Sequence, residues 1–179
     1  MLVYNRIRIL GSVASGKTTL AKQLSIMLKI PYYELDNVVW KRTINGDVRH
    51  TEEERNAIMK FIIQQEQWIV EGVHNEEWVN ESFEKADVII LLNIHLLIRD
   101  VRIIKRFTRQ MLGKETSHYK PTIKMFFKMF KWNRQFEKEY QTIIRQLNQY
   151  NHKLIILSNN QQLENFFNLN LHHLSKKVE

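Results

Sequence analysis

The sequence contains no cysteine and is poor in proline and glycine, with two prolines and five glycines among 179 residues. Without cysteine there is no disulfide framework, no thiol catalysis and no Cys-based zinc site. The scarcity of glycine and proline excludes collagen-like and low-complexity chains. The longest apolar run, Val88 to Ile98, is interrupted by Asn93 and His95 and is too short to cross a membrane as a helix. Residues 1–6 lack the features of a secretory signal, so we expect a cytoplasmic protein.

The positive charge of the chain is concentrated in one segment. Apolar residues make up 44% of the sequence, enough for a sizeable core, and the length predicts a single domain over residues 1–179. The net charge is +8, and residues 99–138 hold 12 Lys and Arg against 3 Asp and Glu. A local excess of this kind predicts one basic surface or lid that faces phosphate groups.

Short apolar segments alternate with longer segments of helical periodicity. We expect strands at 6–10, 31–36, 68–70, 87–94 and 153–157, and helices at 18–29, 51–65, 76–85, 96–112, 122–150 and 162–167. The pair Asn45-Gly46 is a turn signal and predicts a small hairpin within residues 37–50. The alternation of strands and helices predicts an α/β fold in which helices flank a five-stranded parallel sheet.

The strongest motif is a complete phosphate-loop pattern, G-x-x-x-x-G-K-[ST], between the first expected strand and the first expected helix. The glycines allow the backbone to fold around phosphate oxygens, and the amides form a nest at a helix N-terminus. Lys17 should reach the β- and γ-phosphates of ATP, and the Thr18 hydroxyl should bind Mg²⁺. The residues expected to bind the cofactor ATP are Gly11, Ser12, Val13, Ala14, Ser15, Gly16, Lys17, Thr18 and Thr19.

The order of motifs resembles the small-molecule kinases related to adenylate kinase and shikimate kinase, over roughly residues 6–167. That resemblance implies a P-loop NTPase fold with strand order 2-3-1-4-5 and a helical lid over about residues 102–134. Two further runs, LDNVVW at 35–40 and WIVEG at 68–72, look most like the P-loop proteins of the DNA topology modulation family. This family is the one that the sequence resembles most.

Two carboxylates stand where strands are expected to end, at the sheet edge where such folds bind ligands. Asp36 ends the second strand, and the resemblance to shikimate-type kinases implies that it orients the acceptor hydroxyl and takes its proton. Glu34 lies on the same side of that strand and is an alternative to Asp36 as the base. Glu71 ends the third strand, where P-loop proteins hold Mg²⁺. Where adenylate kinases have Asp-Gly-Phe-Pro-Arg, residues 71–75 read EGVHN, which argues against a nucleoside-monophosphate acceptor.

Four arginines recur on one face of the expected helix 96–112: Arg99, Arg102, Arg106 and Arg109. Like charges at this spacing repel, and a polyphosphate ligand would remove the conflict. The resemblance to adenylate kinases implies that Arg102 stacks on adenine and that Arg106 contacts phosphate. Arg106 would then stabilise the charge of the transferred phosphoryl group.

These features favour an ATP- and Mg²⁺-dependent phosphotransferase that acts on an unidentified small-molecule acceptor. Residues 37–50 and 73–84 should form the acceptor pocket. The alternative is an ATP-binding regulatory or nucleic-acid-binding protein that uses the basic segment 99–138. For the second half of this segment, a lid, a nucleic-acid surface, a membrane-surface contact and a core helix with solvated lysines all remain open.

Overall fold

The computed structural model describes residues 4–43, 46–113, 122–159 and 161–166. The N-terminal half contains β1 (Arg6–Gly11), α1 (Lys17–Leu28), β2 (Tyr32–Glu34), α2 (Leu35–Val39), β3 (Trp40–Thr43), β4 (Gly46–Arg49), α3 (Glu52–Ile63) and β5 (Trp68–Glu71). The 3₁₀ helix η1 (Glu77–Val79), α4 (Asn80–Lys85), β6 (Val88–Leu92) and α5 (Leu96–Met111) follow. After α6 (Ile123–Leu147) come the 3₁₀ helix η2 (Asn148–Lys153), β7 (Leu154–Leu157) and a helical stretch at 161–166.

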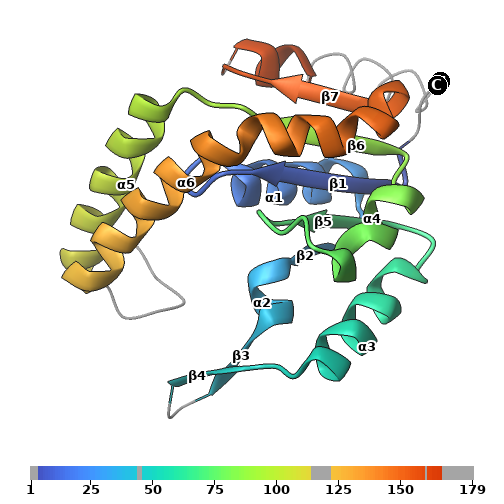
Figure 1. The fold of residues 1–179 in the computed structure, drawn as a ribbon, viewed down its shortest axis with the longest axis horizontal. Coiled ribbons are helices and arrows are strands. Elements are labelled where there is room, and N and C mark those ends of the chain that lie inside the picture. Colours follow the sequence, from blue (N-terminus) through green and yellow to red (C-terminus); the bar gives the residue numbers. More distant parts are fainter. Residues whose placement is uncertain (1–3, 44–45, 114–121, 160, 167–179) are drawn as a thin grey trace.

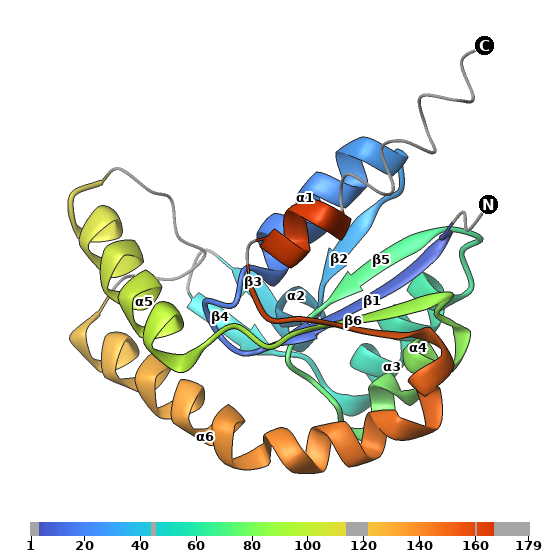
Figure 2. The same cartoon turned by 90° about the horizontal axis from the view of Figure 1, so that it is seen from above.

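The main sheet has the order β2-β5-β1-β6-β7, and every pairing in it is parallel. When only the strands of this sheet are counted, that order is 2-3-1-4-5, so the expected fold class is confirmed. Helices cover both faces of the sheet (Figures 1 and 2). Among the described residues, no helix combines the length and the apolar character that a membrane crossing requires.

Side chains of the central strands alternate between two hydrophobic clusters, as the period of two in a strand requires. Ile9 and Ile90 belong to the cluster beneath α1 and residues 161–166. Leu10 and Ile89 belong to the cluster that packs against α3, α4 and α6. Burial on both faces explains the near-continuous apolar run of β6, whose five residues are all buried.

The sequence predicted most elements within a few residues, and the main error lies after β2. The expected strand 31–36 ends at Glu34, and the next five residues form the short helix α2. Leu35, Val38 and Val39 are buried at the spacing of one helical face, and this packing turns the chain away from the sheet. Asp36 therefore lies in the first turn of α2 and not at a strand end, which corrects its expected place.

Two local predictions are confirmed. The hairpin forms between β3 and β4, with Gly46 opposite Thr43, and the helix expected at 51–65 is α3, which begins with a capping box. Glu54 N donates to Thr51 Oγ1 over 3.2 Å, and Thr51 N donates to Glu54 Oε2 over 2.8 Å. The expected lid connection at 113–121 lies, beyond Gly113, outside the described residues.

Candidate phosphate-binding and phosphotransfer site

The phosphate loop connects β1 to α1 at the carboxyl edge of the sheet. A Cβ atom at Gly11 would come within 2.8 Å of Ser15 Oγ and 3.0 Å of the Leu92 carbonyl oxygen, so no side chain fits there. Gly16, the residue before α1, has a φ of 103°, which is readily adopted only by glycine. The loop thus needs both glycines of the motif.

Lys17 is half-buried at the N-terminus of α1, and its ammonium lies inside the loop. Its Nζ donates to the Ser12 carbonyl oxygen over 2.8 Å. Burial lowers the pKa of Lys17, the carboxylates of Glu71 and Asp36 oppose this lowering, and the cations of Arg8 and Arg106 add to it. These groups therefore act on one another electrostatically, as the residues of one charged site do.

Thr18 and Glu71, the two residues expected at the metal, are in direct contact. Thr18 Oγ1 donates to Glu71 Oε1 over 2.6 Å, because β5 lies beside β1 with Ile9 opposite Glu71. Glu71 is 4% exposed, and burial raises its pKa, while the Lys17 cation and the Thr18 hydroxyl act against the rise. The raised pKa of Glu71 and its short contact with Thr18 make this carboxylate a candidate functional residue at the carboxyl edge of the sheet.

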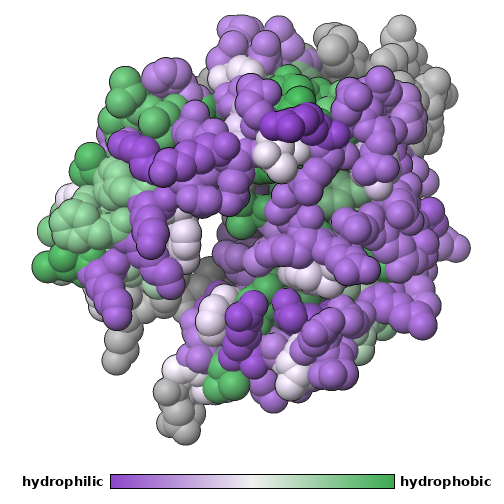
Figure 3. All heavy atoms as spheres, in the orientation of Figure 1, coloured by the Kyte–Doolittle hydropathy of each residue, from purple (hydrophilic) through white to green (hydrophobic). Residues whose placement is uncertain are grey.

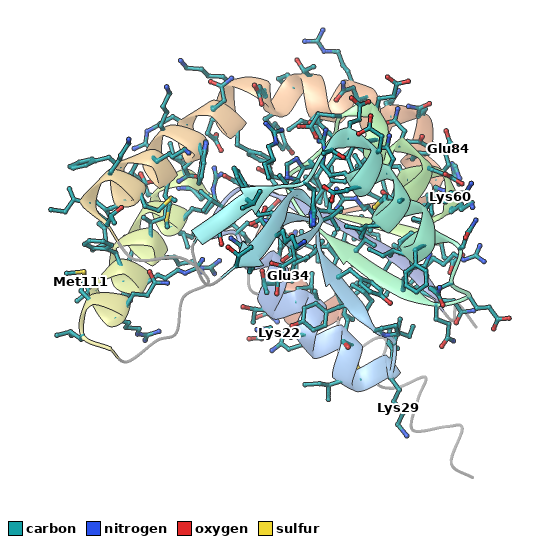
Figure 4. The ribbon with its side chains drawn as sticks, turned by 90° about the horizontal axis from the view of Figure 1, so that it is seen from below. Lys22, Lys29, Glu34, Lys60, Glu84 and Met111 are labelled. Carbon is teal, nitrogen blue, oxygen red and sulfur yellow. The ribbon has the colours of Figure 1, made fainter. Side chains whose placement is uncertain are left out.

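This donor set fits Mg²⁺. The described residues contain no group of three His, Asp or Glu side chains that would form a complete protein cage. Mg²⁺ does not need one, because it usually keeps several waters and is held by one or two carboxylates together with substrate phosphates. Thr18 and Glu71 supply a hydroxyl and a carboxylate beside the loop. Glu34 stands opposite Glu71 in the parallel register, and its charge contributes to the raised pKa of Glu71 (Figure 4 labels Glu34).

On the acceptor side, Asp36 faces a histidine that the sequence analysis did not assign. The side chain of Asp36 is 70% exposed, and its Oδ1 lies 3.9 Å from His74 Nε2. His74 Nδ1 lies 3.1 Å from Glu76 Oε2, and its ring packs on Trp78 with centroids 5.3 Å apart. The sequence placed these residues in the acceptor segment but gave no sign that they would contact one another.

Arg8 is a second residue that the sequence did not reveal. It lies in β1 and is fully buried, and its guanidinium donates to the carbonyl oxygens of Gly72 over 3.2 Å and His74 over 2.7 Å. Burial lowers its pKa to about 9, and nearby Glu71 and Glu76 resist the lowering, so it remains charged at neutral pH. A buried cation of this kind fixes the backbone of the loop that carries His74.

The four arginines of α5 do not share one environment. Arg99 is buried and forms an ion pair with Glu137 of α6. Arg102 Nη1 donates to the carbonyl oxygens of Ala14 over 3.3 Å and Ser15 over 3.0 Å. Arg106 is half-buried and its charge acts on Lys17, whereas Arg109 is exposed. Arg99 needs no bound polyphosphate to balance its charge, because Glu137 neutralises it, whereas the expected nucleotide contacts of Arg102 and Arg106 stay predictions.

A buried polar chain connects the phosphate loop to the pair α5 and α6. Ser12 Oγ donates to Asn133 Oδ1 over 3.0 Å, and Asn133 Nδ2 donates to Asp100 Oδ1 over 2.7 Å. Arg134, which belongs to the basic segment 99–138, donates to both carboxylate oxygens of Asp100 over 3.1 and 2.8 Å. The helices that bear the arginines are thus tied to the loop itself.

Comparison with solved structures identifies the fold, whereas no family model and no curated protein matches the sequence. The shikimate kinase from Acinetobacter baumannii in complex with shikimate superposes with a TM-score of 0.60 at 14% identity, over 98% of this chain and 96% of that chain. The chain has the fold of a P-loop small-molecule kinase. The shikimate kinase from Aquifex aeolicus matches at 18% identity over 95% of this chain and 98% of that chain, with a TM-score of 0.47.

The likeness to the Acinetobacter baumannii enzyme bears on the P-loop kinase fold alone, because the identity is low. No match to the DNA topology modulation family was found, so that resemblance stays a prediction from the motifs at 35–40 and 68–72. The roles of Lys17, Asp36 and Arg106 likewise remain predictions, now with a geometry on which to test them.

Outside the site, the kinase fold carries an exposed surface over α5 and the start of α6 that is both apolar and basic. Figure 3 shows hydrophobic side chains gathered at the left, over these helices. The exposed large hydrophobic residues there are Leu97, Ile98, Val101, Ile104, Met111, Leu112, Ile123, Phe127 and Trp132. The exposed lysines are Lys105, Lys124, Lys128 and Lys131. Much of the basic segment thus lies on the surface, whereas Arg99 is buried.

Proposed function

We propose that this protein is an ATP- and Mg²⁺-dependent phosphotransferase that acts on a small-molecule acceptor. The observation that carries the proposal is the cluster at the mouth of the phosphate loop. Lys17 lies inside the loop, and Thr18 contacts the buried Glu71 beside it. A strand–loop–helix with this trio binds polyphosphate and metal in P-loop enzymes.

In the proposed reaction, an acceptor oxygen forms a bond to the γ-phosphorus of ATP while the bond from that phosphorus to the bridging β–γ oxygen breaks, and ADP leaves. Mg²⁺, held by Thr18 and Glu71, would neutralise phosphate charge. Lys17 binds the β- and γ-phosphates, and Arg106 meets the charge that develops on the transferred group. Arg102 holds the loop and borders the nucleotide. Catalysis comes from positioning and charge stabilisation, without a covalent enzyme intermediate.

Asp36 is the proposed base when the acceptor group is a hydroxyl. Its exposed carboxylate lies 3.9 Å from His74 Nε2 and acts electrostatically on Lys17, so it is within range of both the acceptor side and the phosphate side. Asp36 takes the proton of the attacking hydroxyl. Glu34 remains the alternative base. Because it lies opposite Glu71 in the sheet, a role near the Mg²⁺ site suits Glu34 better than the role of base.

The decisive experiment is a screen of acceptor candidates for ADP release by the pure protein, with Lys17→Ala as the matched inactive variant. Loss of the Lys17 ammonium should abolish phosphoryl transfer and weaken ATP binding while the fold persists, because the lysine contacts the phosphates and not the core. Calorimetry with Mg²⁺-ATP measures the affinity. An ATP affinity that is unchanged in Lys17→Ala would contradict the whole proposal.

The second candidate function, nucleic-acid binding, is favoured by the exposed lysines of α6 and by Trp132, whose ring lies 4.8 Å from Lys128 Nζ. Binding through these groups would weaken steeply as salt rises. DNA affinity measured with and without ATP, and after joint neutralisation of Lys124, Lys128 and Lys131, tests this function. Nucleic-acid binding that does not depend on these lysines would exclude the surface.

A further inference from the structure

Asn133 is a fully buried polar side chain in the middle of α6, far along the sequence from the phosphate loop. Both ends of its amide are used: Oδ1 accepts from Ser12 Oγ, and Nδ2 donates to Asp100 Oδ1. A buried amide is costly unless it is hydrogen-bonded. An apolar residue would pack α6 against the sheet without that requirement, so the polar contacts themselves call for an explanation.

Ser12 is the second residue of the phosphate-loop motif. Its carbonyl oxygen accepts from Lys17 Nζ over 2.8 Å and from Ser15 N over 3.3 Å. A hydroxyl has one proton, and the Ser12 proton is directed to Asn133. The hydrogen bond from Ser12 to Asn133 therefore holds in place the same residue whose carbonyl positions the lysine ammonium.

The other end of the chain reaches α5. Asp100 accepts hydrogen bonds from Asn133 and from both Nη atoms of Arg134. Two residues further along α5, Arg102 donates to the carbonyl oxygens of Ala14 and Ser15. The loop is thus attached to the helix pair at two places: by Arg102 on its outer carbonyls and by Asn133 through Ser12.

We propose that Asn133 is a positioning residue of the nucleotide site, which holds the phosphate loop in its binding conformation through Ser12 and aligns it with α5 through Asp100. This inference rests on the proposed function, because it concerns the same nucleotide. A loop that is ordered before ATP arrives spares the conformational entropy that binding would otherwise have to overcome. Removal of Asn133 should therefore weaken nucleotide binding, although its side chain lies behind the loop.

The experiment compares Asn133→Ala and Ser12→Ala with the wild type and with a control, Gln135→Ala. Gln135 is exposed on the same helix, and its Nε2 donates to Glu139, so its loss leaves the loop untouched. Calorimetry with Mg²⁺-ATP gives the affinity, and thermal unfolding gives the stability. Loss of one or two buried hydrogen bonds of about 1 kcal/mol each predicts an affinity lower by roughly 5- to 30-fold.

Because Ser12 and Asn133 act through one hydrogen bond, the double variant should bind ATP about as well as the weaker of the two single variants. Amides of residues 11–19 should exchange hydrogen faster in Asn133→Ala than in the wild type, even without nucleotide. Gln135→Ala should match the wild type in affinity and exchange. The exchange measurement does not depend on ATP binding.

A second pair of variants reverses the polarity of the network. Asn133→Asp alone places a carboxylate against Asp100 and should weaken ATP binding at least as much as alanine does. Asp100→Asn together with Asn133→Asp restores a donor at position 100 and an acceptor for Ser12, and should recover much of the affinity. If Asn133→Ala fails to fold, Ser12→Ala still tests the inference, because it removes a single hydroxyl.

Four results would count against the inference in different ways. Lower stability with unchanged ATP affinity and unchanged exchange of residues 11–19 would assign Asn133 to packing alone and overturn it. Additive losses in the double variant would overturn the link through Ser12. A wild type that does not bind ATP would overturn the proposed function and this inference together, whereas tight wild-type binding with unaffected variants overturns this inference only.

Discussion

Asp36 lies where two sets of interactions meet, between His74 and the charges around Lys17. Asp36→Asn keeps the shape of the side chain but removes the carboxylate that accepts a proton. Turnover should fall by about a hundredfold or more, while ATP affinity, measured by calorimetry, stays near the wild-type value. If turnover with the true acceptor falls by less than about threefold, Asp36 is structural and the base is a different residue.

Glu71 predicts a characteristic pH dependence of stability. Burial raises its pKa above the ordinary 4.5. At a pH between 4.5 and the raised pKa, Glu71 therefore keeps a proton in the folded protein that it has released in the unfolded chain. The stability contributed by this proton is fully present below pH 4.5 and is lost as the pH rises through the raised pKa. Glu71→Gln has no such proton.

Urea unfolding of wild type and Glu71→Gln at a series of pH values tests this. The wild type should lose free energy of unfolding relative to Glu71→Gln as the pH rises from about 4.5 through the raised pKa. Parallel profiles over that range would mean that Glu71 ionises as an ordinary exposed carboxyl does. Below that window the difference between the two proteins should be constant.

Single residues also show the limit of what the sequence reveals. The phosphate loop was predictable because its residues are consecutive and their spacing is set by one turn. Ser12 and Asn133 are 121 positions apart, and Arg8 binds carbonyls more than 60 positions away. No local pattern encodes such pairs. The one sequence signal for Arg8 is its position in an apolar β-strand, because an arginine that is buried there must have partners for its charge.

At the scale of elements, the arginines of α5 contact different parts of the molecule: Arg99 pairs with α6, and Arg102 binds the phosphate loop. Substitutions of these arginines should therefore have different effects on turnover and stability. Arg106→Ala should lower turnover by about a hundredfold or more, because an arginine that meets the developing charge acts in the transition state. Steady-state kinetics with the identified acceptor measures this. Arg99→Ala should act on stability instead, because Arg99 is buried against Glu137.

Lys124→Ala is the matched control, because Lys124 is an exposed cation on α6 and its loss changes the net charge by the same amount. Its effect on turnover should be small. Equal, small losses for Arg106→Ala and Lys124→Ala would indicate a merely solvated basic face. That outcome would shift support to the polyanion-binding function.

Helices and strands could be predicted from the sequence where a single local pattern determines them. The prediction was less accurate where tertiary packing competes with the local preference of the residues. The capping box of α3 and the glycine turn of the hairpin are rules of this kind. In residues 31–39, the aromatic pair Tyr32 and Tyr33 favours a strand. Leu35, Val38 and Val39, however, form the buried face of a short helix. Tertiary burial decided between the two patterns, and the sequence offered no measure of it.

At the scale of the whole molecule, the proposed lid should respond to ligand. If the region from about 102 to 134 closes over nucleotide, amides in the described part of it, the second half of α5 and the first half of α6, should exchange more slowly with Mg²⁺-ATP bound. A bisubstrate-like ligand should add to this protection. Hydrogen exchange read by mass spectrometry measures it, with α3 as an internal reference.

Protection that is confined to residues 11–19 would show that nucleotide binds without closure. Uniform protection of all helices, α3 included, would indicate global stabilisation instead. Either result would remove the lid from the proposed mechanism while leaving the phosphate site in place.

The position of β1 in the sheet has a consequence for how the chain is made. β1 precedes the other strands of this sheet in the chain, yet its neighbours are β5, where Arg6 pairs with Trp68, and β6, where Ile7 pairs with Val88. The central strand therefore has no partner until β5 has been translated and lacks its second partner until β6 follows, and pairing over such sequence distances is slow. A nascent chain that ends before Val88 already contains the whole Gly11–Thr19 motif. It still lacks one of the two strands that hold this loop in place.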